Sequence, residues 1–231
     1  MELSFKNYAK RFVSLMFGFV LCAYGIALTV NAHLGLSPWD VLYDGGAKQL
    51  TKLLDTQVMI GTLSQIIGFM VLAVDVFMKE KIGIGTILNI VLIGHFINLF
   101  LKYDLAFKSD VLVLRFVFMA LGFIILGFGI YFYMKAGFGA GPRDSFMLAL
   151  ARRGASVPMA RNSMDFAAFV VGVALGGEYG IGTVVSVFIM GYILKYVFRL
   201  FKFDMTQVKH ETVFDTLKNI KTLLSKNGQQ V

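Results

Sequence analysis

The chain has 231 residues, of which 57% are hydrophobic and only 16% charged, with a mean hydropathy of +0.73 and a formal net charge of +8. Soluble domains carry about 25% charged residues, so this composition excludes an ordinary soluble globular protein. The single cysteine, Cys22, excludes an intrachain disulfide and fits no metal-binding spacing.

Six apolar segments of about 20 residues are each long enough to cross a hydrocarbon core of about 30 Å as a helix. Membrane-spanning strands would alternate in polarity at every second residue, which these segments do not. We therefore predict an all-α membrane protein with six transmembrane helices. The predicted spans cover residues 12–32, 58–78, 82–101, 111–134, 157–176 and 180–201.

The first span resembles a signal peptide, because basic residues precede it and a small-residue sequence follows it. Its apolar region is longer than that of a signal peptide, and the same segment recurs later in the chain. We therefore expect it to be retained as a helix.

An internal repeat relates the two halves of the chain. Residues 11–42 align without a gap to residues 115–146, and eleven of these 32 positions are identical. A second match pairs residues 83–86 with 180–183, which both read Gly-Ile-Gly-Thr. Because each copy holds three spans, an odd number, the second copy enters the membrane from the opposite side. This predicts a 3+3 inverted-topology repeat, an arrangement common among secondary transporters.

The repeat divides the chain into four parts. Residues 1–101 form the first three-helix repeat, 102–110 an outer connector, 111–202 the second, inverted repeat, and 203–231 a cytoplasmic tail. Lysine and arginine concentrate on the side of the membrane that holds both ends of the chain, which predicts cytoplasmic termini. This asymmetry also accounts for the positive net charge, so no nucleic-acid binding is expected.

Each copy of the repeat carries a Gly-x-x-Pro-x-Asp motif directly after its first span, at residues 35–40 and 139–144. Proline fits the first turn of a helix, so each motif predicts a short Pro-initiated helix of about 12–16 residues. Ser37 is the expected N-cap of the first, and Asp40 and Asp144 can fold back onto the free amides. These helices are either capped connectors at the membrane surfaces or half-helices inside the membrane, with both aspartates facing a polar cavity.

The two motifs differ where Trp39 in the first corresponds to Arg143 in the second, and just before them, where Asn31 corresponds to Lys135. Tryptophan suits an outer membrane interface, whereas arginine suits the inner interface or an anionic group of a ligand.

Ionisable residues inside spans are costly and are therefore candidates for function. Asp165 lies four residues after Arg161, which is also the spacing of a local salt bridge. His95 either carries protons or hydrogen-bonds a neighbouring helix, and Asp75 is expected only to extend its carboxylate to the membrane surface. The candidate substrate-binding residues are Ser37, Asp40, Asn31, His95, Lys135, Arg143, Asp144, Asn162 and Asp165.

No nucleophile motif, phosphate loop or metal-ligand pattern is present, so neither an enzyme nor a metal or cofactor is expected. In the tail, Val213, Leu217 and Ile220 recur at helical spacing among basic residues. This pattern predicts an amphipathic helix that lies on the inner leaflet or docks a cytoplasmic partner.

The segments GLSPWDVL (35–42) and GAGPRD (139–144) resemble those of the YczE/YitT-like bacterial integral membrane proteins over about residues 10–200. The chain lacks the large soluble carboxy-terminal domain of the YitT branch, so it is more similar to the YczE branch. The resemblance implies a multi-pass protein of the bacterial cell (inner) membrane and supplies no substrate.

Two functions fit these features. The first is a small secondary transporter or permease for a polar small molecule bound between the repeats. The second is an accessory or anchoring protein that supports a cytoplasmic partner through its tail, without transport. A homodimer is compatible with the size of the membrane region, although no motif specifies one.

Overall fold

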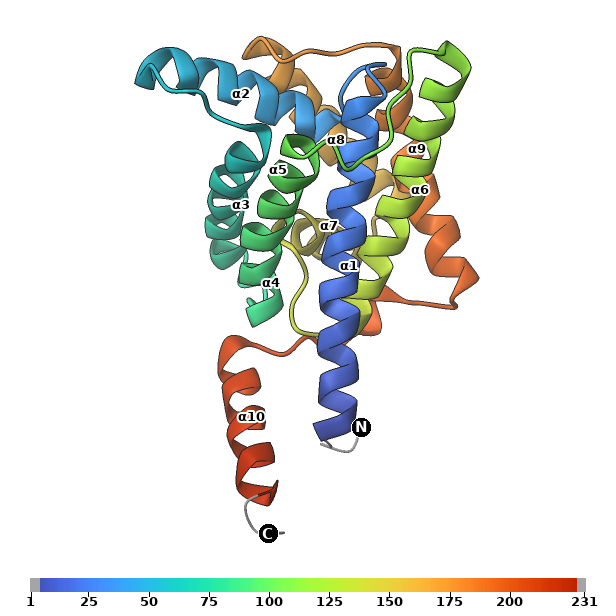
Figure 1. Cartoon of the computed structure of the whole chain (residues 1–231). Coiled ribbons are helices and arrows are strands. Elements are labelled where there is room, and N and C mark those ends of the chain that lie inside the picture. The colour runs from blue at the N-terminus through green and yellow to red at the C-terminus, as the bar shows by residue number, and fades with distance from the viewer. Residues whose placement is uncertain (1–4, 228–231) are drawn as a thin grey trace.

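The computed structural model of the chain describes residues 5–227, and these residues form helices joined by turns and loops, with no strand among them (Figure 1). Five helical segments are long and apolar enough to cross a membrane, which confirms the predicted all-helical membrane class. They are α1 (Phe5–Asn31), α3 (Ile60–Phe77), the segment Ile84–Lys102, α6 (Leu112–Ala136) and α9 (Ile181–Leu200).

The remaining predicted span, 157–176, forms helix α8 (Val157–Ala174) but does not belong to these five. Its first half carries Arg161, Asn162 and Asp165, which lower its hydropathy. Arg161 and Asp165 are buried against the rest of the bundle. The polar half of α8 is thus turned into the protein.

Helices α1 and α6 form the centre of the bundle and run antiparallel (Figure 1). Glycines bring the two backbones together: a Cβ atom at Gly25 would lie 2.6 Å from the carbonyl oxygen of Gly122, and one at Gly18 would lie 2.8 Å from that of Gly129. Small residues allow membrane helices to approach this closely, where dispersion contacts replace the hydrophobic effect. Both helices contribute buried apolar residues to the core, among them Phe19, Phe123 and Tyr133.

The third span is irregular in its middle. It consists of α4 (Ile84–Leu88), one π-helical turn, η1 (Asn89–Ile93), and α5 (Gly94–Lys102). Single π-turns inside helices are often found at functional sites.

The two Pro-x-Asp motifs begin helices α2 (Pro38–Leu54) and α7 (Pro142–Arg152). They have 17 and 11 residues, so the first is longer and the second shorter than predicted. The predicted cap does not form at Ser37, because its hydroxyl donates to Asp40 Oδ2 at 2.5 Å and neither side chain accepts from the free amides. Helix α7 packs inside the bundle against α3 and α8, whereas α2 lies at one end of the bundle (Figure 1) and packs its first turns against α3 and α8.

Several contacts occur twice, at positions that the sequence repeat relates to each other. Arg11 Nε donates to the carbonyl oxygen of Ala136 at 2.8 Å, and Arg115 Nε donates to that of Ala32 at 2.6 Å. The amide of Gly85 donates to Phe138 O and the amide of Gly182 donates to Leu34 O, both at 2.8 Å. In each case, a residue of one half binds the backbone of the other.

The chain after α9 returns to the start of α1. It forms a short 3-10 turn, η2 (Met205–Gln207), and then helix α10 (Val213–Asn227). Glu211 binds Arg11 at 2.7 Å and Tyr8 at 2.9 Å, and Leu223 is buried. Helix α10 extends beside the first turns of α1 rather than lying flat across the end of the bundle (Figure 1), and residues 228–231 of the predicted tail lie outside the described residues.

Candidate functional site

A buried network of charged side chains lies where α7 and α8 meet. Arg161 on α8 donates through Nη1 to Asp144 Oδ1 at 3.2 Å and through Nε to Asp165 Oδ2 at 3.1 Å. The predicted pairing of Arg161 with Asp165 is thus present, and Asp144 joins it from the second Pro-x-Asp motif. Tyr133 on α6 donates a hydrogen bond to Asp144. All four residues are less than 10% exposed, so the network is shielded from solvent on every side.

Helix α2 completes this network from the other half of the chain. Trp39 is buried, and its indole N–H donates to Asp165 Oδ1 at 2.9 Å. An indole N–H that is buried needs an acceptor, and Trp39 finds it on α8. Arg143 lies over the rings of Trp39 and Tyr43, with its guanidinium carbon 5.2 and 5.8 Å from their centres. Trp39 and Arg143, which occupy equivalent positions in the two motifs, thus contact each other.

Asp40 lies in the first turn of α2 and is fully buried. Its Oδ2 accepts from Ser37, while its Oδ1 has no hydrogen-bond partner among the described residues. Arg143, Arg161 and Asp165 are its charged neighbours. The aspartates of both motifs therefore lie in one region, between α2, α7 and α8.

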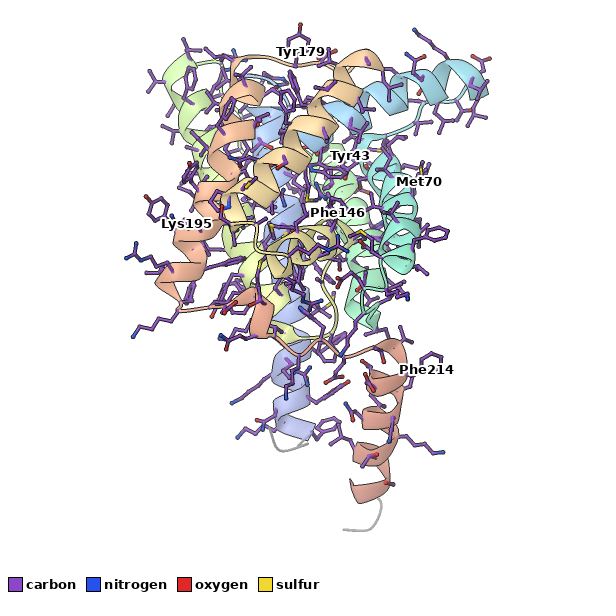
Figure 2. All side chains as sticks on the ribbon, turned by 180° about the vertical axis from the view of Figure 1, so that it is seen from behind. Tyr43, Met70, Phe146, Tyr179, Lys195 and Phe214 are labelled. Atoms are coloured by element: carbon purple, nitrogen blue, oxygen red, sulfur yellow. The ribbon has the colours of Figure 1, made fainter. Side chains whose placement is uncertain are left out.

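A cavity of about 20 Å³ borders the network between α2, α3, η1 and α7. It has room for about one water molecule. Arg143, Trp39, Tyr43, Ser64 and Asn89 contribute to its wall, and Asn89 belongs to the π-helical turn. A second cavity of about 290 Å³ has an apolar lining, and Trp39 lies in the walls of both. In Figure 2, Tyr43 and Phe146 lie within the bundle, near these cavities.

Four predicted site residues are not brought to this cluster. Asn31 donates to the carbonyl of Ala106 at 2.9 Å and so fixes the loop after α5. Lys135 and His95 are exposed on the outside of α6 and α5. Asn162 faces α9, where its amide donates to the carbonyl of Phe188 at 3.2 Å.

Sequence reasoning did not single out Tyr133 and Tyr43, whose aromatic side chains look like ordinary core residues in an apolar span. It also misjudged Asp75, which is 1% exposed and has no hydrogen-bond partner for either oxygen among the described residues. By contrast, Lys195 on α9 points away from the bundle (Figure 2). Among residues 5–227, no group of three or more His, Cys, Asp or Glu side chains could hold a metal ion.

Comparison with known proteins places this architecture among membrane proteins. Residues 9–199 match the model of a family of unknown function, DUF6198. The chain is 32% identical to the uncharacterized membrane protein YczE of Bacillus subtilis over 185 residues, which cover 78% of this chain and 81% of that protein. It is 32% identical to an uncharacterized protein of Haemophilus influenzae over 183 residues (79% and 80%), and 24% identical to YyaS of Bacillus subtilis over 181 residues (77% and 87%).

No solved structure matches the chain. The family match covers most of its length and includes the five apolar helices, α8 and both Pro-x-Asp motifs. The resemblance to the YczE branch is thereby confirmed. The chain belongs to the DUF6198 family of YczE-like, multi-pass membrane proteins.

Proposed function

We propose that this protein is a small secondary transporter or permease for a polar small molecule, built from two inverted three-helix halves with the binding site between them. In this proposal, α8 is the sixth span, the protein resides in the bacterial cell membrane, and both termini are cytoplasmic. Inverted halves with a site near the membrane midplane are a common architecture of secondary transporters.

The contacts that occur twice support the inverted arrangement. Arg11 and Arg115 occupy equivalent positions, and each binds the backbone at the end of the other half's first span. Helix α2 of the first half packs on α8 of the second, and α7 of the second half packs on α3 of the first. Such reciprocal contacts are expected when a two-fold axis relates the halves.

The buried network of Asp144, Arg161, Asp165 and Trp39 is the observation that carries the proposal. Ionisable groups inside a membrane bundle are expensive and by default indicate a pathway for a polar ligand or ion. The network joins the two halves directly at the starts of α2 and α7. Arg143 lies beside it, forms no salt bridge among the described residues and borders the small cavity, so its guanidinium can receive a polar group of the ligand.

In this proposal, the small volume of the cavity corresponds to a closed conformation. A metabolite cannot enter 20 Å³, so binding requires α2 or α7 to move. Trp39 and Val71 line both the small cavity and the larger apolar one, so in this proposal a movement of Trp39 would change both cavities. Opening and closing of one half against the other around a fixed site is the motion that alternating access requires.

The test is a thermal-stability screen of the purified protein against organic acids, amino acids, sugars and nucleosides. A ligand that binds only the folded state at 100 times its dissociation constant adds about 2.7 kcal/mol of stability. We expect a stabilising compound for the wild type and for the control Arg199→Gln, whose side chain is exposed near the end of α9. Arg143→Gln should lose the effect, and a shift that survives in Arg143→Gln would contradict the proposed site.

The accessory function stays a second candidate because of the surface of α10. Phe214 is 84% exposed and Leu217 is 55% exposed, on a helix that projects beyond the bundle (Figure 2). An exposed apolar face of this kind can dock a cytoplasmic partner. The variant Phe214→Ser/Leu217→Ser changes this face without touching Glu211, which ties the chain to Arg11.

The two functions predict different results when each variant is expressed in a strain that lacks the gene, and the measurement is whether the variant restores the wild-type phenotype. An accessory protein requires the face of α10, so Arg143→Gln should complement and Phe214→Ser/Leu217→Ser should not. A transporter gives the opposite result.

A further inference from the structure

The buried charges do not balance. In the described part of the chain, Asp40, Asp144 and Asp165 face two guanidinium groups, those of Arg143 and Arg161. If all five were ionised, this region of the bundle would carry one excess negative charge. Asp75 on α3 is also buried and adds a second, because its charged neighbours, Asp144 and Glu80, are themselves acidic.

The arginines cannot serve the remaining oxygen of Asp40. Arg161 is engaged by Asp144 on α7 and by Asp165 on its own helix, at 3.2 and 3.1 Å. Arg143 is held over the ring of Trp39 and forms no hydrogen bond or salt bridge among the described residues. Asp40 Oδ1 is fully buried and has no hydrogen-bond partner within residues 5–227, where the nearby hydroxyl of Tyr43 forms no hydrogen bond to it.

Asp75 has even less compensation. Both of its oxygens are buried without a partner among the described residues. Glu80 is neutralised by Arg152 at 2.9 Å, so that guanidinium is already paired. On the neighbouring segment α5, His95 is exposed and Lys102 lies in the last turn, toward the other end of the bundle.

An ionised carboxylate without partners in a dry interior costs far more than a carboxylic acid, which carries no net charge. We propose that Asp40 and Asp75 are proton-binding sites, placed on either side of the ion-paired centre formed by Asp144, Arg161 and Asp165. Each binds one proton from water as a carboxylic acid and returns it to water as a carboxylate. No other reactant is involved.

The fold places the two sites toward opposite ends of the molecule. Asp40 begins α2, which lies at the end of the bundle away from α10, whereas Asp75 lies in the last turn of α3, which runs toward the end that carries α10 (Figure 1). Asp144 connects them, since it shares Arg161 with Asp165 and is a charged neighbour of Asp75. This inference deepens the proposed function by naming the proton as the coupling ion, and only that coupling role rests on the proposed function.

Infrared spectroscopy detects the sites directly, because a protonated carboxyl group has a carbonyl band that a carboxylate lacks. We expect the purified wild type at pH 7 to show two such bands, each shifted when water is exchanged for D2O. Asp40→Asn and Asp75→Asn should each remove one band, and asparagine, as a neutral isostere, should preserve the fold. The control Asp55→Asn, at an exposed position after α2, should keep both.

The absence of protonated carboxyl bands at pH 7, or their survival in both variants, would overturn the inference. Stabilisation of the wild type by Na⁺ or K⁺ with no such bands would also overturn it, because a bound cation would then balance the charge. If the bands are present but the thermal-stability screen finds no ligand, the proton-binding sites are supported and the transporter function is contradicted. If a ligand is taken up into liposomes at a rate that does not depend on a proton gradient, only the role of the proton as coupling ion is contradicted.

Discussion

Arg161 is the residue on which the buried network depends, because its one guanidinium group compensates two carboxylates on two helices. Its bonds to Asp144 and Asp165 are both shielded from solvent, with the three side chains less than 10% exposed. Removal of one partner from a buried ion pair leaves an uncompensated charge and costs about 3–5 kcal/mol.

We predict that Arg161→Met lowers the free energy of unfolding by about that amount, measured by denaturant titration in detergent. The control is Lys108→Ala, which removes the exposed pair with Asp104 and should change stability by less than about 1 kcal/mol. A loss no larger for Arg161→Met than for this control would mean that solvent reaches the network.

His210 is a second buried titratable residue, and it lies outside the membrane-spanning helices. Neither ring nitrogen has a hydrogen-bond partner among the described residues. Burial, and then the positive charges of Arg152 and Lys81, lower the pKa of His210 from 6.5 to about 4. The folded protein thus binds a proton at this site more weakly than the unfolded chain does.

The contribution of His210 to stability is therefore complete above pH 6.5 and is lost as the pH falls toward 4. A shift of this size corresponds to about 3 kcal/mol. We predict that His210→Phe reduces the loss of stability between pH 6.5 and 4 by up to this amount, which thermal unfolding at a series of pH values would measure. Parallel pH profiles for variant and wild type would show that His210 is accessible to water.

At the scale of whole elements, the α1–α6 pair depends on glycines where the two backbones touch. A Cβ atom at Gly129 would lie 2.7 Å from the backbone nitrogen and the sulfur of Cys22. At Gly127, two residues earlier on the same helix, it would meet side-chain methyl groups of α9, those of Ile193 at 3.0 Å and Val197 at 3.4 Å, and no backbone atom. The same substitution therefore strains a backbone contact at one position and a movable side chain at the other.

We predict that Gly129→Ala destabilises the protein by about 1–3 kcal/mol through overpacking, whereas Gly127→Ala is nearly neutral. Thermal unfolding of the two variants in the same detergent provides the comparison. Equal effects would show that the helices can separate slightly at Gly129 without loss of other contacts.

The helices themselves were largely predictable from the sequence, because apolar length and proline at a first turn are local signals. The tertiary contacts of individual residues within these helices were not predictable. Asp75 occupies a position near the end of a span where an aspartate can normally reach the surface, but its side chain is buried. The chain turns directly after it, with the amide of Glu80 bonded to the backbone carbonyl of Asp75 at 3.0 Å. Likewise, nothing local to Trp39 indicates that its indole will meet Asp165, 126 residues later.

On the scale of the whole molecule, α1 and the segment before α10 meet at one end of the described bundle. Arg11 in α1 and Glu211 before α10 are joined at 2.7 Å, while the loop between α5 and α6 lies at the opposite end, where Arg115 binds the carbonyl of Ala32. A chain whose ends lie on one side crosses the membrane an even number of times. This agrees with the proposal that α8 is a sixth span, in addition to the five more apolar helices.

The distribution of lysine and arginine predicts that the shared end is cytoplasmic. Labelling of introduced cysteines can test this orientation. The single cysteine of the sequence, Cys22, is buried, so an introduced cysteine can be labelled selectively. In intact cells, a membrane-impermeant maleimide should label Asp110→Cys, in the loop before α6. It should label Lys218→Cys, on the exposed side of α10, only after the membrane is permeabilised. The reverse pattern would invert the orientation, and labelling of both variants in intact cells would mean that the ends lie on opposite sides, with an odd number of crossings.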